Sequence, residues 1–112
     1  GLGDVYKRQM PGVLGFVAVE RDLNSVKRWG DGMIISRIQR TSTGQYTLYH
    51  SQGHTDYIVI VQTTPWAVDG ERWTIGIECG RYNDHFNIQT LDANKGLMNI
   101  DFRVVVIGRP AD

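Results

Sequence analysis

Histidine and acidic side chains are the residues of this chain best suited to chemistry. His50 and His54 flank a short polar loop, and Asp56 follows two residues after the second histidine. Imidazole and carboxylate groups can together hold a metal ion or exchange protons with a substrate. Their spacing, however, does not place two ligands on one face of a predicted strand. We therefore interpret these three as polar loop residues and predict no metal site and no cofactor.

The neighbouring pair Asp84 and His85 has the composition of an acid–base couple. A nucleophilic enzyme would also need a nucleophile beside that pair, and the sequence places no candidate there. Cys79 lies at the end of a predicted strand, where a thiol packs as a small apolar group unless positive charge activates it. We predict no catalytic residues, and hence a protein that is not an enzyme.

Aromatic residues in predicted loops indicate a different chemistry. Trp66 and Tyr82 both fall between strands, and Tyr82 is followed directly by Asn83 and Asp84. Aromatic rings stack on the apolar faces of sugars while amides and carboxylates accept or donate to the hydroxyls. These four residues are the candidate ligand-binding set. The alternative is that each ring folds back to cover one end of the domain.

Composition restricts the class of protein. The chain has 112 residues, of which 41% are hydrophobic and 21% charged, as expected for one folded domain. Twelve basic residues balance twelve acidic ones, so the basic excess typical of nucleic-acid binders is missing. One cysteine excludes an intrachain disulfide. The apolar runs are too short for insertion into a membrane as a spanning helix.

The first nine residues, 1–9, resemble the translation of a transposase sequencing adaptor. Such a segment is not part of the natural protein and does not contribute to the fold, so we assign residues 10–112 to a single domain. We expect a metagenomic origin, in which case Met10 need not be the natural first residue and the natural protein can extend further upstream.

The rest of the chain reads as a series of short strands separated by glycine-rich turns. Side chains alternate between apolar and polar through most of these segments, which is the pattern of a half-buried strand. We predict strands over residues 13–19, 33–39, 45–50, 57–61, 72–79, 85–90 and 98–107. About seven to eight strands without a long helical period indicate an all-β protein, an antiparallel β-sandwich with a jelly-roll-like arrangement.

Several details of this pattern are specific enough to test. Residues 22–29 are expected to form a helical turn capped by Asp22 or Asn24. Residues 57–61 are apolar on both faces and are expected to form a strand that is central in its sheet or lies under a partner. In the segment 72–79, alternation predicts that one set of side chains faces the core: Trp73, Ile75, Ile77 and Cys79.

Two strands carry more apolar surface than a two-layer sandwich can cover. Ile58 and Ile60 lie on one strand, and Val105 and Ile107 lie on the last one. In a sandwich only one face of each sheet is buried against the other sheet. The second apolar face therefore indicates contact with another copy of the chain, and these four residues are the predicted oligomer interface.

Four segments together resemble the C-terminal domain of bacteriophage tail fibres and related phage appendage proteins. Residues 38–48 contain Arg-x-x-Thr-Gly-x-Tyr, and residues 56–61 are an aspartate followed by an apolar run led by tyrosine. Residues 86–90 read Phe-Asn-Ile-Gln-Thr, and residues 100–108 contain Asp-Phe-Arg-Val and end on glycine. The charged segment 20–32 and the region 64–73 depart from the family pattern.

The resemblance implies a β-sandwich head at the tip of a fibre, which acts as a homotrimer in the virion. Its partner would be a glycan or protein on the host cell surface, so the domain would work outside the cell. Two alternatives remain. One is a purely structural subunit, such as a capsid-decoration or extracellular filament protein. The other is a small glycan-active enzyme, against which the missing pair of carboxylates counts.

Overall fold

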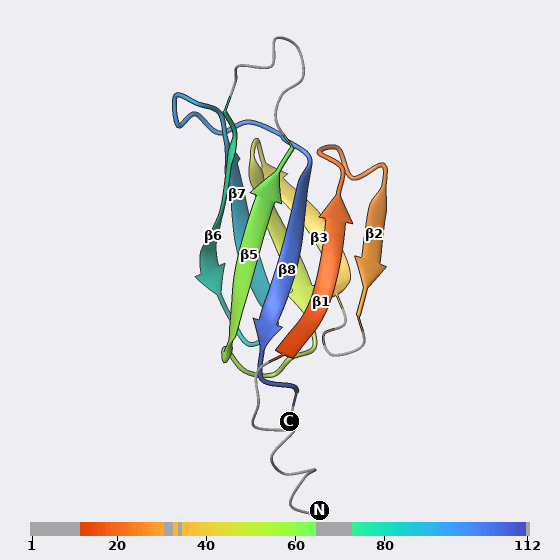
Figure 1. The fold of residues 1–112 in the computed structure, drawn as a ribbon. Helices are drawn as coiled ribbons and strands as arrows, with labels where there is room; N and C mark the ends of the chain where they lie inside the picture. Colours follow the sequence, from red (N-terminus) through yellow and green to blue (C-terminus); the bar gives the residue numbers. More distant parts are fainter. Residues whose placement is uncertain (1–11, 31–32, 34, 65–72, 112) are drawn as a thin grey trace, which may run out of the picture.

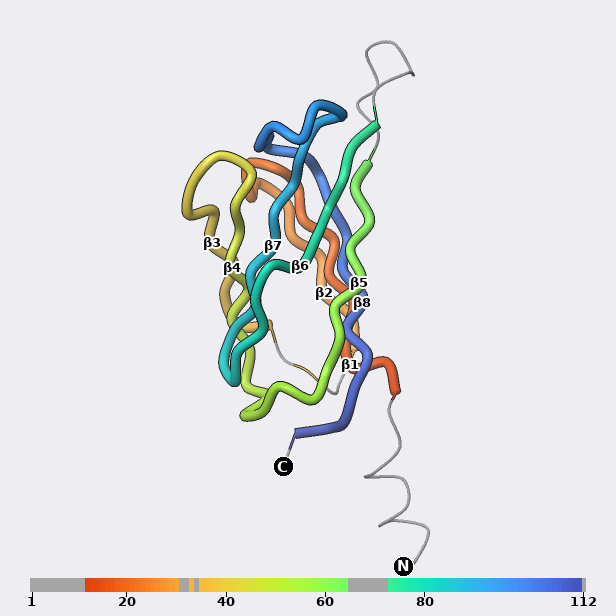
Figure 2. The backbone as a smooth tube through the Cα atoms, turned by 90° about the vertical axis from the view of Figure 1, so that its left-hand side faces the viewer, coloured from red at the N-terminus to blue at the C-terminus, as the bar shows by residue number. Residues whose placement is uncertain are grey.

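The computed structural model describes residues 12–30, 33, 35–64 and 73–111. These residues form eight strands: β1 (Gly12–Val19), β2 (Val26–Trp29), β3 (Ile35–Ser42), β4 (Gln45–His50), β5 (Tyr57–Thr63), β6 (Ile75–Arg81), β7 (His85–Leu91) and β8 (Phe102–Gly108). All pairings are antiparallel and build two four-stranded sheets, so the predicted all-β sandwich is confirmed. Figures 1 and 2 show the sheets as two layers.

The chain crosses repeatedly between the two layers. Sheet A has the strand order β2-β1-β8-β5, and sheet B has the order β3-β4-β7-β6. The pairs β1–β2, β3–β4 and β6–β7 join strands that are consecutive in the chain, whereas β8 returns at the end to lie between β1 and β5. In Figure 1 the last strand, in blue, occupies the middle of the front sheet.

Side chains from both inner faces fill the space between the sheets. Alternation along each strand sends every second residue inward. The buried apolar residues that form this core include Val17, Val19, Tyr46, Leu48, Tyr57, Phe86, Ile88, Phe102, Val104 and Val106. Sequence analysis placed Phe86 and Ile88 inward on β7, and both are completely buried.

The β3–β4 hairpin contains the Thr-Gly-x-Tyr segment of the sequence resemblance. Gly44 has a φ of 67°, in the region that side-chain-bearing residues rarely adopt. Its N–H donates to Asn99 Oδ1 at 2.7 Å, and its carbonyl accepts from the Thr90 N–H at 2.9 Å. The turn is therefore fixed against β7 and against the segment that precedes β8.

The predicted orientation of β6 is wrong. Ile75 and Ile77 are 40% and 42% exposed, Cys79 is exposed, and Trp73, just before the strand, is 80% exposed. Gly76 faces inward instead, where an added Cβ would collide with the Val61 side chain of β5. The sheets approach each other along β5 and β6 (Figure 2), so there is no room for a side chain at position 76.

Two further expectations are corrected. The expected helical turn over 22–29 is a tight turn followed by strand β2, which pairs with β1 from Val26↔Val19 to Trp29↔Phe16. In that turn Leu23 has a φ of 64°, and the Glu20 carboxylate accepts from two backbone N–H groups, those of Asp22 and Asn24. Strand β5 lies at the edge of sheet A, so of its two expected placements the central one is wrong. Among the described residues there is no helix long and apolar enough to span a membrane.

Candidate functional site

Two adjacent rows of apolar side chains cross the outer face of sheet A. Cross-strand register aligns its side chains in rows. One row contains Val13, Ile107 and Ile58; the next contains Trp29, Phe16, Val105 and Ile60. We call these seven residues the apolar face. Ile58 and Ile60 are 52% and 51% exposed, although both are large aliphatic side chains.

The four residues of the predicted oligomer interface lie together within the apolar face. Ile58 pairs with Ile107, and Ile60 pairs with Val105, between the neighbouring strands β5 and β8. Val105 and Ile107 are partly exposed and the two isoleucines of β5 are half-exposed. The β5–β8 half of this face is therefore a flat aliphatic surface suited to packing against another flat surface.

The outer face of sheet B is polar over its central strands, although β6 exposes Ile75 and Ile77 at its edge. Its two central strands carry polar residues toward solvent: Gln45, Thr47, Asn87 and Gln89. The Thr47 hydroxyl donates to Asn87 Oδ1 at 2.8 Å, so part of this polar surface is satisfied internally. The two central strands of sheet A carry apolar residues at the corresponding outer positions, among them Phe16 and Val105.

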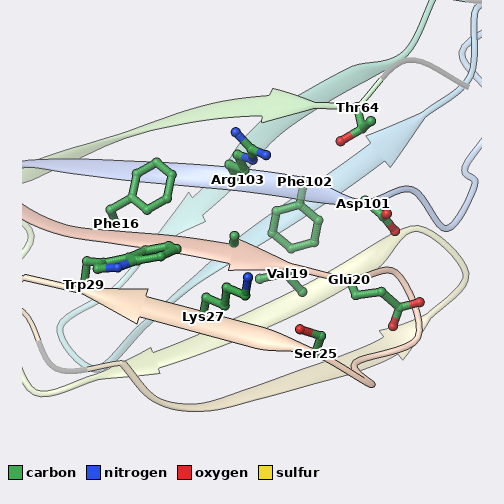
Figure 3. A pocket seen from close by; sticks show the side chains of 11 residues that line it. Phe16, Val19, Glu20, Ser25, Lys27, Trp29, Thr64, Asp101, Phe102 and Arg103 are labelled. Atoms are coloured by element: carbon green, nitrogen blue, oxygen red, sulfur yellow. The ribbon is translucent and has the colours of Figure 1, made fainter.

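A groove lies next to the apolar face, over β2, β1 and β8 (Figure 3). It has a volume of about 470 Å³. Lys27 and Arg103 stand on either side of Ala18 in one cross-strand row, and Trp29 and Phe16 form the next row. The indole and phenyl rings pack at 4.9 Å between centroids. Because Ala18 is small, the space between the two cations stays open.

Acidic groups line the far end of this groove but are already engaged. Asp101 accepts from the Arg21 backbone N–H at 2.9 Å and from Arg21 Nε at 3.1 Å. The Glu20 carboxylate accepts hydrogen bonds from two backbone N–H groups of the turn before β2. Lys27 and Arg103, in contrast, have no hydrogen-bond or ion-pair partner among the described residues. Their positive charges are available to an incoming group.

The predicted ligand-binding residues come together only in part. Trp66 lies outside the described residues. Tyr82, Asn83 and Asp84 form the turn between β6 and β7, with Tyr82 49% exposed. The Tyr82 ring stacks on His85 at 4.4 Å between centroids, and an added Cβ at Gly80 would lie 3.1 Å from the tyrosine ring. The ring thus lies against His85 and Gly80 of sheet B and stays half exposed.

The Asp84–His85 pair is an exposed electrostatic contact. Asp84 Oδ1 lies 2.6 Å from His85 Nδ1, and this hydrogen bond lowers the pKa of the Asp84 carboxyl below its usual value. Tyr49 packs on His85 at 5.7 Å, and the Arg37 guanidinium lies 5.0 Å from the centre of the Tyr49 ring. The pair thus belongs to a strip of stacked rings on the surface of sheet B.

His50 and His54 are buried, and they do not converge on a common ligand position. His50 Nδ1 accepts from the Gln52 N–H, so its Nε2–H donates to the Tyr57 hydroxyl at 2.9 Å. Tyr57 in turn donates to the Tyr82 carbonyl at 2.7 Å. Asp56 donates its backbone N–H to His54 Nδ1 at 3.0 Å. Among the described residues, no group of three or more His, Cys, Asp or Glu side chains could hold a metal ion.

Burial sets the protonation of this network. It lowers the pKa of His50 and raises the pKa of Tyr57 to about 12, because each charged form would lose its hydration. Both side chains therefore stay neutral near pH 7. Their hydrogen bonds tie the end of β4 to the start of β5 and to the β6–β7 turn, which is a structural task.

We expect the stability of the fold to decrease as the pH falls below about 6.5, the ordinary pKa of histidine. The unfolded chain takes up a proton on His50 at a higher pH than the folded chain, so protons favour unfolding in that range. Urea unfolding between about pH 5 and pH 8 measures the slope. His50→Gln should flatten it, and an unchanged slope would show that His50 does not contribute.

The groove residues were missed by the sequence reasoning. Lys27 and Trp29 alternate with Val26 and Arg28, but the helical interpretation of residues 22–29 hid that period. The alternation of residues 26–29 is the signal that could have identified them. Comparison with protein-family models, with curated proteins and with solved structures found no match to this chain.

Proposed function

We propose that this chain is the distal domain of a phage tail fibre or related virion appendage, which assembles as a homotrimer and binds a host-surface glycan. The apolar face of sheet A is the observation that carries the proposal. A contiguous surface of Ile, Val, Phe and Trp is costly to leave in water, at about 25 cal/mol per Å². A second and third copy of the chain would cover its aliphatic half on β5 and β8.

The location of the aliphatic half favours a symmetric assembly of identical chains. Ile58 and Ile60 are on the edge strand β5, so this half borders one side of the sandwich. Three such borders can meet around an axis while the β1–β2 side of each sheet stays at the periphery. The sequence resemblance to phage appendages supports a trimer, and it involves residues of β3, β4, β5, β7 and β8.

The double substitution Ile58→Lys and Ile60→Lys is expected to convert the trimer to a monomer, because six ammonium groups would gather at the interface. Light scattering of the full chain measures the mass, which should be three times 12.7 kDa before the change and 12.7 kDa after it. Circular dichroism checks that the variant remains folded.

The matched control is Ile75→Lys with Ile77→Lys, on the outer side of β6 in sheet B. These isoleucines are 40% and 42% exposed, so the control adds the same charge at a similar exposure. It should leave the trimer intact. If the unsubstituted chain is a monomer, or if both variants dissociate equally, assembly through the apolar face is contradicted. If the unsubstituted chain is a dimer, its assignment to a trimeric fibre tip is contradicted.

A purely structural subunit would have the same interface and no receptor. Probing a glycan array with the full chain separates the two functions, since only the adhesin should retain specific glycans. If the trimer binds no glycan specifically, a capsid-decoration or filament protein is favoured. Hydrolysis of a glycan, abolished by Asp84→Asn with His85→Gln, would instead support the enzyme alternative.

A further inference from the structure

The groove at the margin of the apolar face offers one aromatic surface and two cations that have no partner among the described residues. Lys27 on β2 and Arg103 on β8 are separated by β1, which places their backbones about 10 Å apart. Both side chains are exposed and long enough to reach a group lying over Ala18 between them. Figure 3 shows the two cations on opposite sides of β1, with Trp29 and Phe16 beyond them.

We propose that this groove binds a sugar that carries a carboxylate, as part of an acidic surface glycan. The planar guanidinium of Arg103 matches a carboxylate with two parallel hydrogen bonds, and the Lys27 ammonium supplies the second charge. The exposed Trp29 ring provides an apolar surface for the C–H face of the same sugar ring. This inference rests on the proposed function, because it names the ligand class of the receptor.

The size and charge of the groove fit this occupant. A volume of about 470 Å³ is in the range of small-ligand sites and accommodates one or two sugar rings. Glu20 and Asp101 at the far end are held by backbone N–H groups and by Arg21, and they direct an anionic group toward Lys27 and Arg103. The engaged carboxylates can still accept hydrogen bonds from sugar hydroxyls.

The site is compatible with the trimer. The aliphatic interface uses β5 and β8, whereas the groove is over β2, β1 and the Arg103 end of β8. The two surfaces meet at the row formed by Trp29, Phe16, Val105 and Ile60. A groove at the margin of an interface remains accessible, and three copies raise the apparent affinity for a glycan that carries several acidic sugars.

The test is a titration of the full chain with methyl glucuronide and with methyl glucoside, followed by NMR of the tryptophan indole N–H groups. The two sugars differ only by the carboxylate at carbon 6. We expect methyl glucuronide to bind with about tenfold higher affinity, as two charge-assisted hydrogen bonds at an exposed site allow. The Trp29 signal should shift with both sugars. Equal affinity for the two sugars would overturn the proposal.

Substitutions locate the binding. Lys27→Gln and Arg103→Gln are each expected to weaken methyl glucuronide binding about fivefold and to leave methyl glucoside unchanged. Arg28→Gln is the matched control, because it removes the same charge from the next position of β2, where the side chain points away from this face. A similar loss from Arg28→Gln would show that net charge, rather than the groove, attracts the ligand.

Three further outcomes are informative, and the last two distinguish this proposal from the one on which it rests. Glucose 6-phosphate binding much more tightly than methyl glucuronide would replace the carboxylate by a phosphate ester and overturn the ligand class. Failure of all three sugars to bind, while light scattering shows a trimer, would reject the groove and leave the assembly intact. A monomeric chain that still binds methyl glucuronide through Lys27 and Arg103 would keep the groove and reject the assembly.

Discussion

Phe86→Ala is expected to lower the free energy of unfolding by about 3–5 kcal/mol, the usual cost of removing a buried phenyl ring. Phe86 is completely buried on β7. Its ring lies 6.1 Å from that of Tyr57 on the opposite sheet and 5.9 Å from the His50 ring. A cavity at this position would separate the sheets and loosen the hydrogen-bonded His50–Tyr57 pair. Urea unfolding followed by circular dichroism measures the change.

Trp73→Ala is the informative control for this prediction. Alternation in the sequence assigned both aromatic residues to the core, but Trp73 is 80% exposed. Its removal should therefore change the free energy of unfolding by no more than about 0.5 kcal/mol. If the alanine variant of Phe86 does not fold, Phe86→Leu keeps most of the volume and should cost about 1 kcal/mol. Equal losses at positions 73 and 86 would contradict the orientation of β6.

The comparison of β6 with β7 shows what alternation can predict. On β7 the buried set consists of Phe86, Ile88 and Thr90, so hydrophobicity identifies the inner face correctly for the first two. On β6 the inner set begins with Gly76, and the large apolar residues lie on the outer face of the sheet. Alternation divides a strand into two sets, but the inner set depends on how closely the facing sheet approaches, and that is a property of the whole fold.

The same limit separates the predicted site from the missed one. Ile58, Ile60, Val105 and Ile107 could be grouped from sequence because each strand is apolar on both faces, and register then placed them side by side. The groove depends on Lys27 and Arg103, which are 76 positions apart in the chain, flanking Ala18 in one row. These two residues come close together only because β8 returns to the centre of sheet A.

Gly44→Ala is expected to lower the free energy of unfolding by at least about 3 kcal/mol. A side chain at a φ of 67° costs about 1–2 kcal/mol in itself. An added Cβ would also lie 2.6 Å from the Thr90 oxygen and 2.7 Å from the Met98 nitrogen, both of them backbone atoms. Moving these atoms apart would weaken the Gly44–Asn99 and Thr90–Gly44 hydrogen bonds, each of which contributes about 1 kcal/mol.

Gly53→Ala separates the two causes of that loss. Gly53 also has a positive φ, of 80°, but an added Cβ there meets no atom within 4 Å. It should lose only the conformational part, about 1 kcal/mol. The difference between the two variants in urea unfolding then measures the contact of the β3–β4 turn with β7 and with the segment before β8. Equal losses would mean that the turn is held by its own geometry alone, and that the Thr-Gly-x-Tyr segment has no role in closing the end of the sandwich.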